Sequence, residues 1–272
     1  MKIIIASDSF KGTLSSRQAG QAMRQGVRRA LPAAEIEVIP VADGGGGTVA
    51  ALVAARRGRY RFASVRDPYG ARIRARCGEF DGGRHVVLEM AGSSGLTLLA
   101  PSRRDPTRTS TAGVGDQIGA ALARGAATIW IGAGGSATVD GGCGAAQALG
   151  IRFYDRDGRL IRASLCGGNL DRIARVDVAQ RDPRLDGCRL RVLCDVTNPL
   201  CGPDGAARVF GPQKFRPDRP VPANNIKLLD DNLAHLANVI RRTLGVSLAR
   251  MPRAGAAGGL AGGLHALASA NL

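Results

Sequence analysis

Carboxylates and a lysine lie next to apolar runs or glycines at three places in the sequence. Lys11 follows Asp8 and Ser9 just after the first apolar run, Asp43 precedes four glycines, and Asp195 ends another apolar run. A lysine ammonium neutralises phosphate oxygens. A carboxylate accepts a proton from an alcohol or helps to hold a hydrated magnesium ion. These residue types therefore indicate phosphate chemistry.

Each of the three charged residues also has a plain structural interpretation. Lys11 can be an exposed residue at the entry of a helix, Asp43 can be the first residue of an Asx turn, and Asp195 can cap a strand end. The residue types alone do not distinguish these structural roles from roles in a catalytic site. The segments around them carry further information.

Two glycine-rich segments share the same character. Residues 129–144 (IWIGAGGSATVDGGCG) begin within an apolar, strand-like run, and residues 42–48 (ADGGGGT) follow one. Both segments precede a helical pattern. Glycine permits a close backbone approach, and a loop that opens a helix can present N–H groups to an anion. A tight turn is the alternative for either loop alone, but two loops favour one shared anionic ligand. The candidate binding residues are Gly44, Gly45, Gly47, Thr48, Gly134, Gly135, Ser136, Thr138 and Asp140.

The remaining chemistry-bearing residues do not form a familiar hydrolytic or metal centre. The three histidines lie in strand or helix patterns, and the six cysteines show neither a CxxC pair nor a Cys/His ligand spacing. No GKS or GKT sequence of a Walker A loop occurs. Phosphoryl transfer needs mainly positioning and charge neutralisation, so phosphate-binding loops, one cation and several carboxylates predict a small-molecule kinase.

Charge and composition limit the class of protein. The net charge of +16 raises nucleic acid as a partner, but the excess is scattered arginine without a nucleic-acid-binding motif, so we expect no specific nucleic-acid partner. We expect free thiols, no signal peptide and no membrane span, and hence a cytoplasmic location. The oligomeric state is not predictable from the sequence.

The order of apolar patterns predicts an α/β fold. Strands are expected at 2–6 and 36–41, with a helix between them that stops before Pro32, and a second helix over 49–55. Alternating short strands follow at 60–65, 71–77 and 85–90, with further strands at 128–131 and 190–194. A hairpin is expected over 151–160, and the longest helix over 225–244. Ligands of such folds bind beyond the carboxyl ends of the strands.

Seven collinear motifs resemble those of bacterial glycerate kinases. They are SDSFKGTLS (7–15), VADGGGGT (41–48), EMAGSSGL (89–96), RDPTRTSTAGVGD (104–116), IGAGGSATVDGGCGAAQALG (131–150), CDVTNPLCGPDGAARVFGPQK (194–214) and GAAGGL (255–260). The resemblance implies transfer of the ATP γ-phosphate to a hydroxyl of D-glycerate with Mg²⁺. It also implies two α/β domains: a Rossmann-like domain of residues 1–59 and 251–272, and an inserted mixed-sheet domain of residues 60–250.

The resemblance supports site residues in four loops. It covers Asp8, Ser9 and Lys11, then Asp43 with its glycines, then Ser136, Thr138 and Asp140, and finally Asp195 and Asn198. We assign Asp195 as the base and Lys11 as the phosphate cation. The magnesium ligands and the phosphorylated hydroxyl, which decides between 2- and 3-phosphoglycerate, stay open.

Departures from the family pattern keep a second interpretation open. Gly46 stands where the family usually has a glutamate, and Ser7 where it usually has a proline. Family members usually continue beyond the Ala/Gly-rich region, whereas this sequence ends at Leu272, so we expect an incomplete Rossmann-like sheet with an open edge. The alternative is a truncated, inactive homologue that only binds nucleotide or glycerate. A third interpretation, a basic nucleic-acid-binding protein, predicts salt-sensitive retention of DNA.

Overall fold

A five-stranded mixed sheet is the centre of the computed structural model, which describes residues 1–10 and 13–272. Its strands lie in the order β3-β4-β5-β6-β9, and they comprise β3 (Arg59–Arg66), β4 (Arg72–Phe80), β5 (His85–Glu89), β6 (Thr128–Gly132) and β9 (Arg189–Leu193). The pairs β3–β4 and β4–β5 are antiparallel, whereas β5, β6 and β9 run parallel. The carboxyl ends of the three parallel strands therefore meet at one edge of the sheet.

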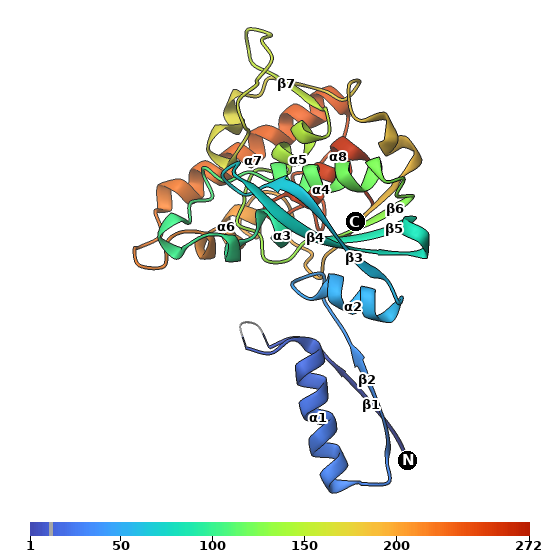
Figure 1. Ribbon diagram of the computed structural model, residues 1–272. Coiled ribbons are helices and arrows are strands. Elements are labelled where there is room, and N and C mark those ends of the chain that lie inside the picture. The colour runs from blue at the N-terminus through green and yellow to red at the C-terminus, as the bar shows by residue number, and fades with distance from the viewer. Residues whose placement is uncertain (11–12) are drawn as a thin grey trace.

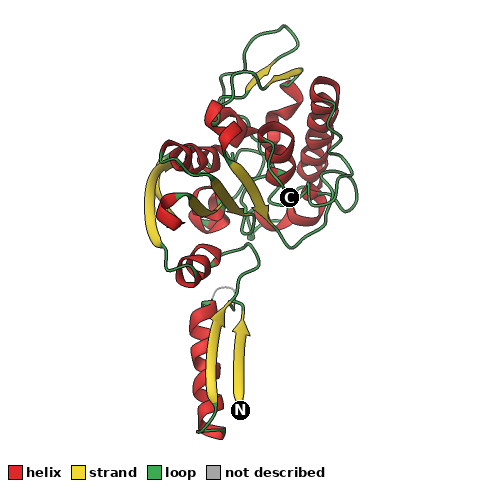
Figure 2. Cartoon of the chain, turned by 90° about the vertical axis from the view of Figure 1, so that its right-hand side faces the viewer, coloured by secondary structure: helices red, strands yellow, loops and turns green. Residues whose placement is uncertain are grey.

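Helices cover both faces of this sheet. Because side chains alternate along a strand, Val86 and Leu88 of β5 point to one face and Val87 points to the other. The first face packs against α4 (Ala112–Ala123), α5 (Cys143–Ala148) and α8 (Leu260–Ala268). The second face packs against α2 (Thr48–Ala55). Figure 2 shows the strands between these layers of helices.

The N-terminal β-α-β unit stands apart from the large sheet. It consists of β1 (Lys2–Ser7), α1 (Ser16–Ala30) and β2 (Glu35–Pro40), and its two strands form a parallel sheet of their own (Figure 1). Ser15 caps α1 through a capping box with Gln18, as expected for a polar residue just before the apolar periodicity. Ile5, Ala34 and Ile36 form the small buried apolar cluster of this unit, and Ala19 of α1 is also buried.

A second apolar core surrounds the longest helix, α7 (Ala223–Leu244). It includes residues of α6 (Ala206–Phe210) and of the short antiparallel strands β7 (Arg152–Tyr154) and β8 (Arg175–Asp177). The predicted long helix is confirmed. The predicted hairpin over 151–160 is corrected in part, because the ladder partner of β7 is β8. The expected turn does form, closed by the bridge between Tyr154 and Leu160 and by the hydrogen bond from the Asp155 N–H to the Arg159 carbonyl at 2.9 Å.

The chain is an α/β protein with parallel and mixed sheets, as predicted. The division into residues 1–59 with 251–272 and residues 60–250 stays a prediction. Apolar contacts of the described residues join α2 and α8 to the large sheet, so a boundary drawn from packing falls between β2 and α2. Among the described helices, none is long and apolar enough to cross a membrane.

Candidate functional site

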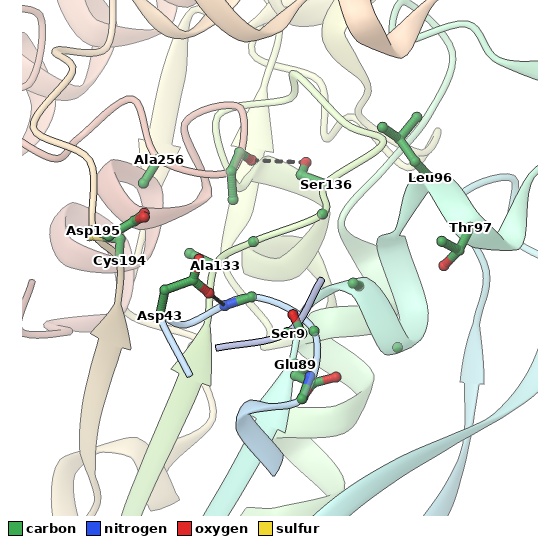
Figure 3. A pocket seen from close by; sticks show the side chains of 18 of the residues that line it. Ser9, Asp43, Glu89, Leu96, Thr97, Ala133, Ser136, Cys194, Asp195 and Ala256 are labelled. Carbon is green, nitrogen blue, oxygen red and sulfur yellow. Dashed lines mark hydrogen bonds between the residues drawn. The ribbon is translucent and has the colours of Figure 1, made fainter. Parts of the chain in front are cut away.

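A cleft of about 950 Å³ lies between the N-terminal β-α-β unit and the carboxyl edge of the large sheet (Figure 3). Five loops or strand ends contribute polar side chains to it: Ser9 after β1, Asp43 after β2, Glu89 at the end of β5, Ser136 after β6 and Asp195 after β9. The two glycine-rich loops therefore face one common space, as their shared character predicts.

Direct backbone packing holds the two glycine-rich loops together. The Gly134 N–H donates to the Gly44 carbonyl at 3.1 Å. A Cβ atom at Gly134 would lie 2.5 Å from the Gly45 Cα, and one at Gly44 would lie 2.5 Å from the Leu193 carbonyl oxygen. Gly44 also has a φ of 92°, which side-chain-bearing residues rarely adopt. Glycine is required at Gly44 and Gly134 by the contact between backbones.

A carboxylate of the chain occupies the N-terminus of α2. Glu89 Oε1 accepts hydrogen bonds from the N–H groups of Gly47 and Val49, each at 2.9 Å. A carboxylate at this position satisfies N–H groups that have no partner within the helix and interacts favourably with the helix dipole. Thr48 is buried and its hydroxyl donates to the Gly45 carbonyl at 2.8 Å, so it fixes the loop and does not line the cleft.

The N-terminus of α5 is closed in the same way, by Asp140. This carboxylate is fully buried and accepts from the Thr111 N–H at 2.7 Å, the Thr111 hydroxyl at 2.8 Å, and the N–H groups of Gly142 and Gly144 at 3.0 and 3.2 Å. Burial raises the pKa of the Asp140 carboxyl, and the hydrogen bonds oppose that rise. The expectation that this helix end faces an external anion is corrected, because Asp140 itself caps it.

A buried lysine that the sequence analysis did not select lies at the wall of the cleft. Lys214 lines the cleft with only 2% of its surface exposed, and its Nζ donates to the Thr138 carbonyl at 2.8 Å and to Ser136 Oγ at 3.3 Å. Desolvation lowers the pKa of Lys214 to about 7, although the Asp140 carboxylate acts in the opposite direction. Lys214 can therefore exchange a proton near neutral pH.

The structure brings eight of the predicted residues to the cleft. These are Ser9, Asp43, Gly45, Gly47, Gly134, Gly135, Ser136 and Asp195. Lys11 lies outside the described residues. The functional roles given to all of these residues stay predictions.

The other predicted residues do not line the cleft. They are Asp8, Gly44, Thr48, Thr138, Asp140 and Asn198. Asp8 Oδ1 accepts from the Ser9 N–H at 2.6 Å, and Asn198 Nδ2 donates to the Asp204 carbonyl at 2.8 Å. Thr138 is buried and presents its carbonyl to Lys214. These side chains position the loops.

The cleft offers both anion-binding groups and an apolar wall. Among the described residues, the backbone N–H groups of Gly46 and Gly135 have no acceptor, and both residues line the cleft. The apolar lining residues include Phe10, Leu14, Leu96, Leu98, Val196 and Phe210. A ligand with a phosphate-rich part and a planar apolar part suits this combination.

Metal binding by the protein alone is not indicated in the described part of the chain. No group of three or more His, Cys, Asp or Glu side chains there is arranged to hold a metal ion. Mg²⁺ usually retains waters and binds one or two carboxylates together with substrate phosphates. The carboxylates of Asp43 and Asp195 at the cleft fit that donor set and do not fit a fully protein-made cage.

The fold and the cleft together define an α/β protein with a glycine-lined binding site for an anionic small molecule. A family model described as the glycerate kinase family matches residues 3–272, and the chain belongs to this family of enzymes. It is 45% identical to the glycerate 2-kinase of Escherichia coli (strain K12) over all of this chain and 70% of that protein. It is 46% identical to the glycerate kinase of Bacillus subtilis (strain 168), covering 100% of this chain and 69% of that one.

A solved structure has the same fold. The putative glycerate kinase 2 of Salmonella typhimurium LT2 superposes with a TM-score of 0.87 at 43% identity, covering all of this chain and 71% of that one. The α/β fold and the membership of the family therefore rest on sequence and structure together.

Proposed function

We propose that the chain transfers the γ-phosphate of ATP to a hydroxyl of D-glycerate, giving phosphoglycerate. The observation that carries this proposal is the meeting of Asp43, the two glycine-rich loops, Lys214 and Asp195 in one cleft. Membership of the glycerate kinase family supports the substrate pair. A cytoplasmic location belongs to the same proposal.

Asp195 is the proposed base. It follows β9, is exposed at the cleft, and has an acceptor carboxylate at the edge where the parallel strands end. The substrate hydroxyl gives its proton to this carboxylate while its oxygen forms the new bond to the γ-phosphorus. The bond from that phosphorus to the bridging oxygen breaks, and ADP leaves with the electron pair.

The phosphate charge is neutralised by cations and backbone donors. Lys11 is proposed as one cation, and Lys214 supports Ser136 and the loop from behind with its ammonium. The free N–H groups of Gly46 and Gly135 are proposed phosphate donors. Mg²⁺, held by phosphate oxygens and the Asp43 carboxylate, would reduce the charge repulsion between phosphates.

A coupled assay of ADP formation that depends on both ATP and D-glycerate tests the proposal. We expect Asp195→Asn to lower kcat by about 10²- to 10⁴-fold, the range for loss of a general base, while ATP binding measured by calorimetry is retained. Asp204→Asn is the matched control, because Asp204 is exposed, lies nearby in sequence and does not line the cleft.

Two results would count against this assignment. Equal turnover by the wild-type chain and Asp195→Asn would remove Asp195 as the base. Binding of ATP and glycerate without any turnover by folded wild-type chain would favour the inactive homologue. NMR of the product decides between the 2- and 3-phosphate.

A further inference from the structure

A second hollow, of about 490 Å³, is lined by five arginines and one acidic residue, Asp105. The arginines are Arg103, Arg104, Arg108, Arg216 and Arg219. No residue lines both this hollow and the glycine-lined cleft, although Phe215 in the hollow directly follows Lys214 in the cleft. Part of the motif at 104–116, which has no role in the proposed transfer, forms one wall.

Carboxylates near the hollow do not balance its positive charge. Asp218 forms an ion pair with Arg216 at 2.7 Å, and Asp105 Oδ1 accepts from the N–H and hydroxyl of Thr107. In residues 1–10 and 13–272, no carboxylate oxygen lies within 4 Å of a guanidinium nitrogen of Arg104, Arg108 or Arg219.

Arg104 contains a buried donor that has no acceptor within the described chain. Its Nε is inaccessible to solvent and makes no hydrogen bond. Buried polar groups are satisfied in the great majority of cases, and a charged donor left without a partner is unfavourable. Arg104 is one of the residues that line the hollow, so an unsatisfied donor of a charged group lies in its wall.

The first turn of α7 adds positive potential to the same hollow. Pro222 and Asn225 line it, and Pro222 is the N-cap of this helix of 22 residues. Proline has no side-chain acceptor, and no side chain caps the helix. The positive end of the α7 dipole therefore lies beside the arginines.

We infer that this arginine hollow binds a small molecule with two or more phosphate groups, at a site separate from the proposed site of phosphoryl transfer. Arginine recognises phosphate through paired N–H donors, and several guanidinium groups around one hollow suit a multiply charged anion. An extended nucleic acid is less suited, because such sites offer free aromatic faces for base stacking. Here Arg103 covers the Tyr69 ring at 5.1 Å, and Phe215 is 6% exposed.

Calorimetry with inorganic pyrophosphate at fixed ionic strength tests this inference. The test pair is Arg108→Gln with Arg219→Gln, two exposed arginines whose removal leaves the partly exposed Arg104 intact. The matched control is Arg28→Gln with Arg29→Gln, which removes the same charge from the exposed end of α1. Circular dichroism establishes that both variants fold.

We expect the test pair to weaken pyrophosphate binding about tenfold or more, and the control pair to change it less than twofold. Pyrophosphate should also protect Arg104, Arg108 and Arg219 of the wild-type chain from phenylglyoxal, read by peptide mass spectrometry. Equal weakening by both pairs, no weakening by either, or a lack of protection would overturn the inference. The inference would also be overturned if the chain bound an RNA oligonucleotide and did not bind pyrophosphate, and if the test pair weakened that RNA binding. None of these outcomes depends on turnover, so failure here is distinct from failure of the proposed kinase activity.

Discussion

Replacing Lys214 by methionine removes a buried ammonium while keeping a side chain of similar length. In the wild-type chain this ammonium is desolvated, which lowers its pKa from 10.5 to about 7. Because the folded-state pKa lies below the unfolded-state pKa, the unfolded chain binds more protons between these two values. The free energy of unfolding therefore rises with pH in this window, and the stabilisation is lost as the pH falls through 7.

The size of the effect follows from the two pKa values. Across the whole window between the two pKa values, the free energy of unfolding changes by about 5 kcal/mol, at ~1.4 kcal/mol for each pKa unit. Between pH 7 and pH 9 the folded lysine loses most of its proton and the unfolded lysine keeps it. This part of the window contributes about 2 kcal/mol to the wild-type chain and nothing to Lys214→Met.

Urea unfolding at pH 7, 8 and 9 measures this contribution. Trp130 is the single tryptophan of the chain, lies on β6 and stacks on Phe80, so its fluorescence reports unfolding of the large sheet. Burial raises the pKa of Cys143 and raises that of Cys201 to about 12, which lowers the stability of both chains as the pH rises above about 9. The difference between the two chains cancels this cysteine term.

Lys227→Met is the matched control, because Lys227 is exposed and forms an ion pair with Asp231 on the surface of α7. We expect its stability to follow that of the wild-type chain with pH. A Lys214→Met chain whose stability also runs parallel to the wild type from pH 7 to pH 9 would refute the reasoning. The same variant should lose up to about a hundredfold in kcat/KM, because Lys214 holds Ser136 and its loop in place at the wall of the cleft.

Three further expectations concern the loops and the N-terminal unit. Gly134→Ala should destabilise the chain by about 1 to 3 kcal/mol and weaken ATP binding, because its Cβ would lie 2.5 Å from the Gly45 Cα. Gly46→Ala, where a Cβ meets nothing within 4 Å, is the control, and equal behaviour of the two variants in calorimetry would contradict this account. Asp140→Asn should lower the free energy of unfolding, measured in urea, by about 3 kcal/mol. The new amide NH₂ would face N–H donors that bind a carboxylate in the wild-type chain. A change below about 0.5 kcal/mol would contradict this. In hydrogen exchange, the described residues among 2–40 should exchange faster than β6, and equal protection would count against this. The core of the N-terminal unit is small, with Ile5, Ala34 and Ile36 each 8 to 9% exposed, whereas Ile129 and Ile131 of β6 are fully buried.

The local elements were predictable because their signals are local. The apolar periodicity over 225–244 lies within α7, and the Ser15 cap precedes α1 as its polar type indicates. The meeting of the two glycine-rich loops was also predictable, because both loops have the same character and each follows a strand. The two strands lie in different sheets, β2 in the two-stranded sheet and β6 in the five-stranded one, so a shared sheet edge does not explain the meeting.

The roles of buried charged groups were not predictable in the same way. Asp140 resembles a phosphate-loop residue in the sequence, but its partner Thr111 lies 29 residues away, and only the tertiary structure reveals the pairing. Glu89 was assigned to a strand, and its capping of α2 spans 40 residues or more. Lys214 lies in no periodic element. Its signal was its rarity, since it is one of four lysines in a chain rich in arginine.

The two capped helix ends determine where the cleft can hold phosphate. Glu89 occupies the N-terminus of α2 and Asp140 that of α5, so neither helix dipole is open to an incoming anion. Both carboxylates add negative charge near the loops, which a phosphate-rich ligand would oppose. The attraction must then come from the loop N–H groups of Gly46 and Gly135 and from lysine ammonium groups. A lysine beside Asp140 meets this requirement, because the carboxylate that closes the helix also favours the charged form of Lys214.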